Sequence, residues 1–379
     1  MVFTSRAGDL VETPLAVCPG MDGSSLNCAS VFVRDRQTGT TTLVSVSNEG
    51  QPGNADSFHL DISADGRWIA FSSGANNLDE AKRGWELGVF LHDREARTVQ
   101  LLSPSGNEPA ISADGRFVVF SGLGDGWNVY VFDRTTGQSE LLSASTDGQP
   151  GDGDSLSPDI SADGRWVAFW SWAGNLTADD VEHCQPQGRN YSCGDVFLFD
   201  RQTGERIRLP VGVGYGLGMG TFGLSLSGDG GRLTFNDVVY DRASGQLGPL
   251  CSEAINCSGG VLSEDGLSVI YADGPNIYVF DRLTGERELV SVTSDGVAGN
   301  GTVVNYSFTS EGEQLQPGVA LSADGRWVAF SSTADNLTDG DAAQCSNFLF
   351  AAHNCYDIFI HDRSSGATEW ISRPIDIEQ

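Results

Sequence analysis

Alternating apolar and polar positions recur in short runs along the chain and predict β-strands. The clearest runs end in Asp-Arg, as in VFVRDR (31–36), VFLHDR (89–94), VYVFDR (129–134) and IYVFDR (277–282). A period of two over such a length is that of a half-buried strand. No segment shows the periodicity of an amphipathic helix, so the pattern predicts an all-β chain.

A tight turn and a short apolar strand precede most of these runs. ISADGRW (62–68) is followed by IAFSS (69–73), and LSADGRW (321–327) is followed by VAFSS (328–332). In Asp-Gly the glycine supplies the positive φ that a hairpin turn requires, and in most copies a second turn, DRxTG, leads into a last strand. Each unit therefore consists of four strands joined by three turns.

The Asp-Arg signature counts the units. It occurs seven times, at Asp35, Asp93, Asp133, Asp200, Asp241, Asp281 and Asp362. The repeat predicts one domain over 1–379, a seven-bladed β-propeller of four-stranded antiparallel blades that end near 47, 103, 145, 211, 250, 293 and 373. The first unit begins at its second strand, so we expect the C-terminal strand at Ile375–Glu378 to close that blade.

The phrase SADGR, AFSS and VFVxDRxTG resembles the TolB-type, WD-like repeat of exported bacterial propellers. It covers essentially the whole chain. The resemblance implies the propeller architecture and says little about activity, because that architecture hosts unrelated functions. Some TolB-like propellers are lyases, so the resemblance leaves an enzymatic function open.

The charge balance excludes two classes of partner. The chain has 51 Asp and Glu against 22 Lys and Arg, a formal net charge of −29. Such a surface repels phosphate backbones and anionic headgroups, so we expect no nucleic-acid partner. No apolar run reaches the ~20 residues of a membrane span, so we expect no membrane insertion. The sequence given contains no signal peptide of the basic-then-apolar kind.

The eight cysteines form four close pairs in polar, Gly-rich segments. The pairs are Cys18/Cys28, Cys184/Cys193, Cys251/Cys257 and Cys345/Cys355. Local pairing of an even number predicts loop-stapling disulfides and an extracytoplasmic location, which means secreted, periplasmic or cell-surface. The alternative is zinc, but the spacings lack CxxC, and only His183 and His353 lie near a pair.

Length variation is confined to the connections on one face, which we call the loop face. Long insertions open with AGDL (7–10), ANNL (75–78), AGNL (173–176) and ADNL (334–337). Long loops on a rigid scaffold are frequent binding sites, and aromatic side chains there suit sugar rings. The residues expected to contact a ligand are Trp85, Trp127, Trp172, Tyr191 and Tyr356.

These features lead us to expect an exported, non-catalytic module that binds carbohydrate or a cell-surface glycoconjugate. One alternative is a polysaccharide-degrading enzyme, a lyase or a glycoside hydrolase, with its site over the central channel. Its candidate catalytic residues are Asp179, Asp180, His183 and His353. A second alternative is a protein-interaction scaffold. No GxSxG, HExxH or Walker motif occurs, and the sequence assigns no partner to His59.

The connections that precede each new blade are rich in Asp, Asn and Gly. In TDGQPGDGDS (146–155), oxygen ligands alternate with glycine as in calcium loops, and the candidate ligands are Asp147, Asp152 and Asp154. The bidentate Glu of an EF-hand is missing, and any tight polar loop uses the same residues. Calcium is therefore an expected cofactor with an ordinary polar loop as its alternative.

Overall fold

The protein is an all-β, seven-bladed β-propeller. The structure, a computed structural model, describes residues 1–19, 25–178, 183–184, 191–192, 194–213, 224–236, 238–251, 260–302, 307–308, 314–315, 318–340, 344–345, 353–354 and 357–374. Every regular element in these ranges is a strand, as predicted. These ranges contain no helix that is long and apolar enough to cross a membrane. Contacts divide the chain into unit 1, Met1–Gly220, and unit 2, Thr221–Gln379.

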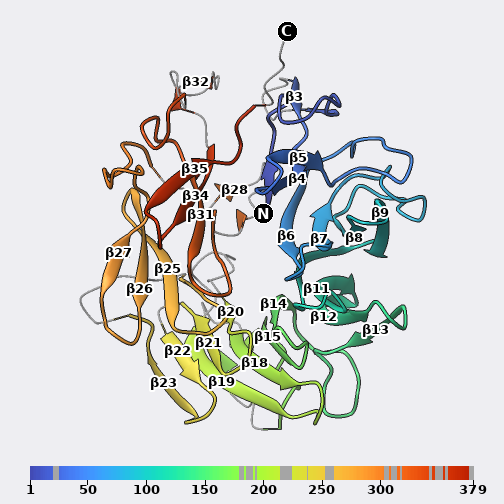
Figure 1. Ribbon diagram of the computed structural model, residues 1–379. Helices are drawn as coiled ribbons and strands as arrows, with labels where there is room; N and C mark the ends of the chain where they lie inside the picture. Colours follow the sequence, from blue (N-terminus) through green and yellow to red (C-terminus); the bar gives the residue numbers. More distant parts are fainter. Residues whose placement is uncertain are drawn as a thin grey trace. The chain divides into compact units, whose positions relative to one another are not determined.

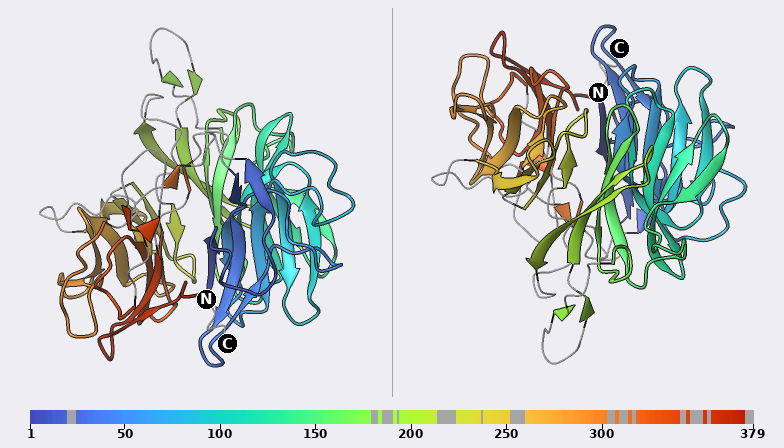
Figure 2. Two further views of the ribbon diagram at one scale, coloured as in Figure 1. Left: turned by 90° about the horizontal axis from the view of Figure 1, so that it is seen from above. Right: turned by 90° about the horizontal axis from the view of Figure 1, so that it is seen from below.

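Unit 1 contains four antiparallel sheets, coloured blue to green in Figure 1 and standing side by side in Figure 2. The first sheet has three strands in the described residues, and each of the others has four. In order the strands are β1 (Val2–Ser5), β4 (Ser30–Asp35) and β5 (Thr40–Leu43); β6 (Ser57–Ile62), β7 (Trp68–Ser73), β8 (Gly88–Asp93) and β9 (Thr98–Ser103); β10 (Gly106–Ile111), β11 (Phe117–Gly124), β12 (Gly126–Asp133) and β13 (Gln138–Leu141); and β14 (Ser155–Ile160), β15 (Trp166–Ser171), β18 (Gly194–Asp200) and β19 (Arg206–Val213).

Unit 2 contains three four-stranded antiparallel sheets. Their strands are β20 (Ser225–Leu226), β21 (Arg232–Phe235), β22 (Val238–Asp241) and β23 (Gln246–Pro249); β24 (Val261–Leu262), β25 (Ser268–Asp273), β26 (Asn276–Asp281) and β27 (Arg287–Leu289); and β30 (Val319–Leu321), β31 (Trp327–Ser332), β34 (Asp357–Asp362) and β35 (Ala367–Trp370). A short pair, β28 (Ser307–Phe308) and β29 (Gln314–Leu315), precedes the last sheet. The expected closing strand at Ile375–Glu378 lies outside the described residues.

Three insertions contain small hairpins of matching register. They are β2 (Val17–Pro19) with β3 (Ser25–Asn27), β16 (His183–Cys184) with β17 (Tyr191–Ser192), and β32 (Gln344–Cys345) with β33 (His353–Asn354). In the first hairpin Cys18 lies opposite Leu26, and the predicted disulfide to Cys28 is present. Cys184 lies opposite Tyr191 and Cys345 opposite His353, each two residues before the expected partner cysteine.

Of the remaining cysteines, Cys251 is disulfide-bonded. Its expected partner Cys257, like Cys193 and Cys355, lies outside the described residues, and the side chains of Cys184 and Cys345 are not described. The pairing of these three sets therefore stays a prediction, which the shared backbone register of the hairpins supports for Cys184/Cys193 and Cys345/Cys355.

The aspartate of the repeated Asp-Arg motif forms an ion pair with the arginine that follows the Asp-Gly turn of the same blade. In the fourth blade Arg165 donates to both carboxylate oxygens of Asp200, at 2.9 and 2.6 Å. Arg67 with Asp93, and Arg326 with Asp362, repeat this bidentate geometry. These arginines lower the pKa of their aspartate partners, because each guanidinium stabilises the charged carboxylate.

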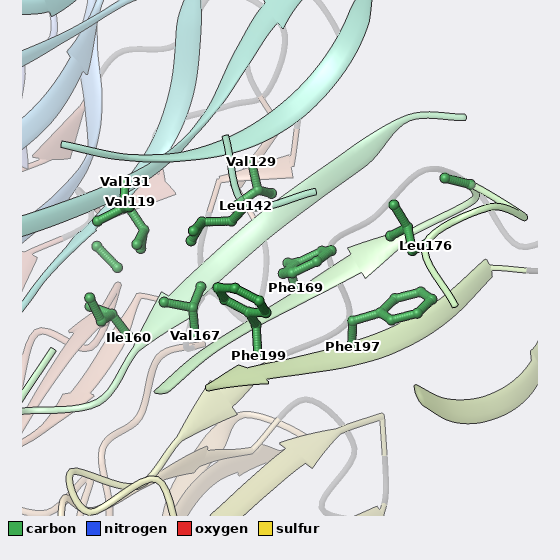
Figure 3. Packing of buried hydrophobic residues seen from close by; sticks show 12 residues of the cluster. Val119, Val129, Val131, Leu142, Ile160, Val167, Phe169, Leu176, Phe197 and Phe199 are labelled. Carbon is green, nitrogen blue, oxygen red and sulfur yellow. The ribbon is translucent and has the colours of Figure 1, made fainter. Parts of the chain in front are cut away.

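Apolar side chains fill the space between neighbouring sheets. Between the third and fourth blades, Phe169 and Phe197 stack with ring centroids 5.7 Å apart, and both are fully buried. Figure 3 shows them with Val119, Val129, Leu142, Ile160 and their neighbours. This packing fixes one blade against the next and holds their first strands in place.

Candidate functional site

The first described strand of each of the four sheets in unit 1 lies along one edge of that unit. β1 contacts β6, β6 contacts β10, and β10 contacts β14 (Figure 1). Each of the last three strands has a register shift of one residue against its sheet partner, which is a β-bulge. Bulges of this kind redirect side chains and are frequent next to active sites.

The three bulges share an unusual backbone. His59, Glu108 and Ser157 all have positive φ, at 45°, 53° and 53°. Such values are uncommon outside glycine and cost about 1–3 kcal/mol each, and they occur preferentially at functional sites. Three non-glycine residues at the same position of consecutive blades make this edge the strongest site candidate in the described residues of unit 1.

The bulge residues form hydrogen bonds from blade to blade. His59 Nδ1 lies 2.7 Å from Asn107 Oδ1 on β10. Glu108 Oε2 accepts hydrogen bonds from the Ser157 backbone N–H at 2.9 Å and the Ser157 hydroxyl at 3.1 Å, both on β14. The bonds therefore connect the second blade to the third and the third blade to the fourth.

His59 has a defined tautomer in this arrangement. Because the Asn107 amide oxygen can only accept, Nδ1 of His59 must donate, and the neutral ring then carries its lone pair on Nε2. The His59 side chain is 7% exposed, and Nε2 is buried without a hydrogen-bond partner. A buried acceptor without a donor costs about 1–3 kcal/mol, which an arriving donor would remove.

Asp61 and Asp159 lie along the same edge, at equivalent positions of β6 and β14, two residues after the bulge residue of each strand. Asp61 accepts from the backbone N–H of Ile62 and from that of Ile111 on β10, both at 2.8 Å. Burial and, to a smaller extent, the negative charge of Asp159 together raise the pKa of Asp61 to about 7. Asp61 is therefore a carboxyl group that holds a proton close to neutral pH.

We call His59, Asp61, Asn107, Glu108, Ser157 and Asp159 the inner-strand site. Both His59 and Asp61 reach toward β10, since one bonds to Asn107 and the other to Ile111. Two residues along a strand span roughly 6–7 Å. The site therefore combines a carboxyl group that can donate a proton, Asp61, with a ring nitrogen that can accept one, His59 Nε2.

The expected ligand-binding aromatics lie away from these residues. Trp85 is 66% exposed in the insertion of the second blade. The backbone N–H of Trp127 donates to the Asp154 carboxylate, and that of Trp172 donates to the Asp154 carbonyl oxygen, so one aspartate brings both tryptophans together. Tyr356 lies outside the described residues, and of Tyr191 only the backbone is described.

The expected catalytic residues are not placed by the structure. Asp179 and Asp180 lie outside the described residues, and His183 and His353 are described only as backbone in β16 and β33. Their catalytic role stays a prediction without structural support. The inner-strand site was missed because its contacts join residues almost 50 positions apart.

The predicted calcium ligands each have a separate local role. Asp147 accepts from the Ser145 hydroxyl, Asp154 accepts from Trp127, and Asp152 accepts from the Gly174 backbone N–H at 2.8 Å. The bond of Asp152 joins the connection to the start of the following insertion. Asn54 does the same in the second blade, where it donates to Asn76 at 2.8 Å. The recurrence supports a structural role for these loops, and calcium binding stays a prediction.

A sequence signal for the inner-strand site does exist in the repeat. Aligned on their common ending, the first strands read SFHLDIS, GNEPAIS and SLSPDIS. The Ile-Ser ending recurs, whereas the bulge position changes from His59 to Glu108 to Ser157. Non-equivalent polar residues at one position of a structural repeat are a mark of a site.

Comparison with known proteins identifies the fold. No family model matches the chain, and no curated protein is similar to it in sequence. Among solved structures, the β-propeller domain of the Trilobed protease from Pyrococcus furiosus is 10% identical with a TM-score of 0.52, covering 96% of this chain and 93% of its own. An oligogalacturonate lyase in complex with manganese is 13% identical with a TM-score of 0.50, covering 89% and 82%.

TolB from Acinetobacter baumannii is 14% identical, covering 90% of this chain and 75% of its own, with a TM-score of 0.45. At that score the likeness does not establish the TolB-type family. All three identities are low enough that the likeness shows the propeller fold alone.

The expectation of a non-catalytic carbohydrate-binding module is wrong as the leading function. The similar propellers are an oligogalacturonate lyase and the β-propeller domain of a protease, so both come from enzymes. The physical reason for the error is that exposed aromatics were weighed without the buried acid–base groups, which only the fold brings together. The alternative, a polysaccharide-degrading enzyme, is better supported.

Proposed function

We propose that the protein is a polysaccharide-degrading enzyme that cleaves glycosidic bonds by acid–base catalysis at the inner-strand site. The observation that carries the proposal is the pairing of His59, whose Nε2 is buried and unpartnered, with Asp61 two residues away on β6. Breaking a glycosidic bond needs a proton for the leaving oxygen and a base on the other side of the bond. This strand offers both groups.

Each group has a role that follows from its surroundings. Asp61 donates its proton to the glycosidic oxygen, because burial keeps it protonated close to neutral pH. His59 accepts a proton at Nε2, while its bond to Asn107 holds the ring in the required tautomer. Glu108, held by Ser157, places a carboxylate beside the positive charge that develops on the sugar ring.

The similar oligogalacturonate lyase was solved with manganese, so a metal must be tested against the donors present here. Within the described residues, one group of three side chains has metal-ligand spacing: Cys18, Cys28 and Asp56. Both cysteine sulfurs are joined in a disulfide and cannot ligate as thiolates. This group of donors therefore does not fit a metal ion.

We also propose that the chain is a TolB-type repeat propeller that acts outside the cytoplasm. The recurring SADGR and DRxTG phrases support the family, and the Cys18–Cys28 disulfide supports an oxidising compartment. Its proposed partner is the polysaccharide substrate.

Activity on a polysaccharide panel, measured as new reducing ends, tests the proposed function. His59→Asn keeps a donor for Asn107 and a side chain that tolerates positive φ, but it removes Nε2. We expect this variant and Asp61→Asn to lower kcat at least ~100-fold, the usual contribution of a catalytic acid or base. Asp114→Asn, in the Asp-Gly turn of the third blade, is the control and should retain activity. Full activity in both site variants refutes the roles assigned to them.

A further inference from the structure

Positive charge is missing from the segments that lead into and form the first strand of the second to the seventh blade. Segments 44–62, 104–111, 142–160, 214–226, 250–262 and 290–321 together contain twelve Asp and Glu but no Lys or Arg. All 22 basic residues of the chain lie elsewhere. In unit 1 these first strands form the edge that carries the inner-strand site, so that edge holds carboxylates and no Lys or Arg.

Most of the described arginines are instead held at the opposite ends of the strands, in the Asp-Gly and Asp-Arg turns. Arg67 pairs with Asp93 there, and Arg116 pairs with Asp133. On the loop face of unit 1, Arg6 is paired with Asp56 at 2.6 Å, and Lys82 is buried with Nζ donating to the carbonyl oxygens of Gly84 and Glu86. These cations are occupied by the protein itself.

This charge distribution bears on which glycan the inner-strand site can process. Cleaving a uronate by elimination places negative charge on the substrate carboxylate, and that charge needs a cation or strong donors beside it. At the inner-strand site the substrate would instead meet the carboxylates of Glu108 and Asp159. Like charges placed together cost several kcal/mol. Hydrolysis has the opposite requirement, because its transition state is positively charged on the sugar ring.

We infer that the substrate of the inner-strand site is a glycan without acidic groups, neutral or amino-bearing, and that the site cleaves it by hydrolysis. The inference rests on the proposed function. Besides the carboxylates of Glu108 and Asp159, it stands on the His59 side chain, which is buried with Nε2 unpartnered. A bound water that donates to Nε2 would satisfy it.

The step balances with water as the only co-reactant. The bond between the anomeric carbon and the bridging oxygen breaks, and the bridging oxygen takes the proton of Asp61. The oxygen of water bonds to the anomeric carbon, and its proton passes to Nε2 of His59. Return of that proton to Asp61 through solvent restores the site. The products are two saturated sugar chains, one with a new reducing end, and no unsaturated end is formed.

The test compares three classes of glycan: neutral xylan and β-glucan, the amino glycan chitosan, and the acidic polygalacturonate and alginate. Reducing ends measure any cleavage, and ultraviolet absorbance of unsaturated ends measures elimination. We expect reducing ends without unsaturated ends from a neutral or amino glycan, and at least hundredfold lower kcat/KM on the acidic glycans.

The possible outcomes separate the two proposals. Cleavage of polygalacturonate or alginate with unsaturated ends overturns the substrate class and leaves the proposed function standing. No cleavage of any glycan overturns the proposed function, and the inference falls with it.

A charge variant gives a readout that does not depend on turnover. Glu108→Gln removes one negative charge from the inner-strand site. The affinity of this variant for oligogalacturonate should therefore be at least threefold higher than that of the wild type at low salt, and the gain should shrink at high salt. Glu140→Gln, on the exposed outer strand of the same blade, makes the same change away from the site and should leave the affinity unchanged. Equal affinities of both variants for oligogalacturonate would contradict the repulsive role given to Glu108.

Discussion

Replacing Asp61 by asparagine tests whether burial between the second and third blades keeps this carboxyl protonated. Its pKa is raised from the usual 3.8 to about 7, chiefly by burial and further by the charge of Asp159. The folded protein therefore binds more protons than the unfolded chain between about pH 4 and pH 7, and its stability falls as the pH rises through that range.

The magnitude follows from the two pKa values. The difference between 7 and 3.8 is about three pKa units, and at ~1.4 kcal/mol per unit the loss of stability between pH 4 and pH 8 is about 4 kcal/mol. Asparagine does not titrate, so this loss disappears in the variant. The amide has one oxygen, however, and one of the two N–H groups of Ile62 and Ile111 loses its acceptor, which costs about 1 kcal/mol.

The two effects have opposite signs, so the stability order should reverse with pH. We expect Asp61→Asn to be less stable than the wild type by about 1 kcal/mol at pH 4 and more stable by about 3 kcal/mol at pH 8. Urea midpoints followed by tryptophan fluorescence at pH 4, 5, 6, 7 and 8 measure this, with Glu140→Gln as the control for one lost charge. A difference between wild type and Asp61→Asn that is the same at every pH refutes the reasoning.

Three further predictions concern the scaffold. Arg165→Met leaves the carboxylate of Asp200, 1% exposed, without its cation, and should lower the melting temperature and the urea midpoint at neutral pH. Because Arg165 lowers the pKa of Asp200, the pair's contribution is present at neutral pH and is lost as the pH falls below about 4. Equal stability of wild type and variant at neutral pH would contradict this prediction. Alkylation of the unfolded, unreduced chain should leave Cys18 and Cys28 unlabelled, as read by mass spectrometry, and labelling of either means that the disulfide does not form. If the connection that contains Asp152 binds calcium, a chelator should lower the melting temperature, and an unchanged temperature excludes a structural calcium there.

The repeat allowed the fold to be predicted, because each of its signals is local. The alternation in VYVFDR and the Asp-Gly turn before it depend only on neighbouring residues. Seven copies then leave little choice of architecture, since each sheet must bury its faces against the next. The ion pair of Arg165 with Asp200 was predictable for the same reason, because both residues occupy fixed positions in a motif that recurs.

The Cys18–Cys28 disulfide belongs to the same predictable group. Both cysteines lie in one insertion, and a hairpin brings them together with a sequence separation of 10. Local pairing could be read from spacing alone, whereas the ligand of the loop face could not. Exposed aromatics such as Trp85 favoured sugar binding, but exposure by itself names no chemistry.

What the sequence determined by itself was therefore the repeat, the strand order of each blade, the turn chemistry and the acidic character of the chain. Only the tertiary structure decided the site. His59 meets Asn107 because two blades pack side by side, and the raised pKa of Asp61 exists only where folding excludes water from its carboxyl. A one-residue bulge in each first strand changes which side chains face the neighbouring blade, and that shift depends on packing between strands that are distant in sequence.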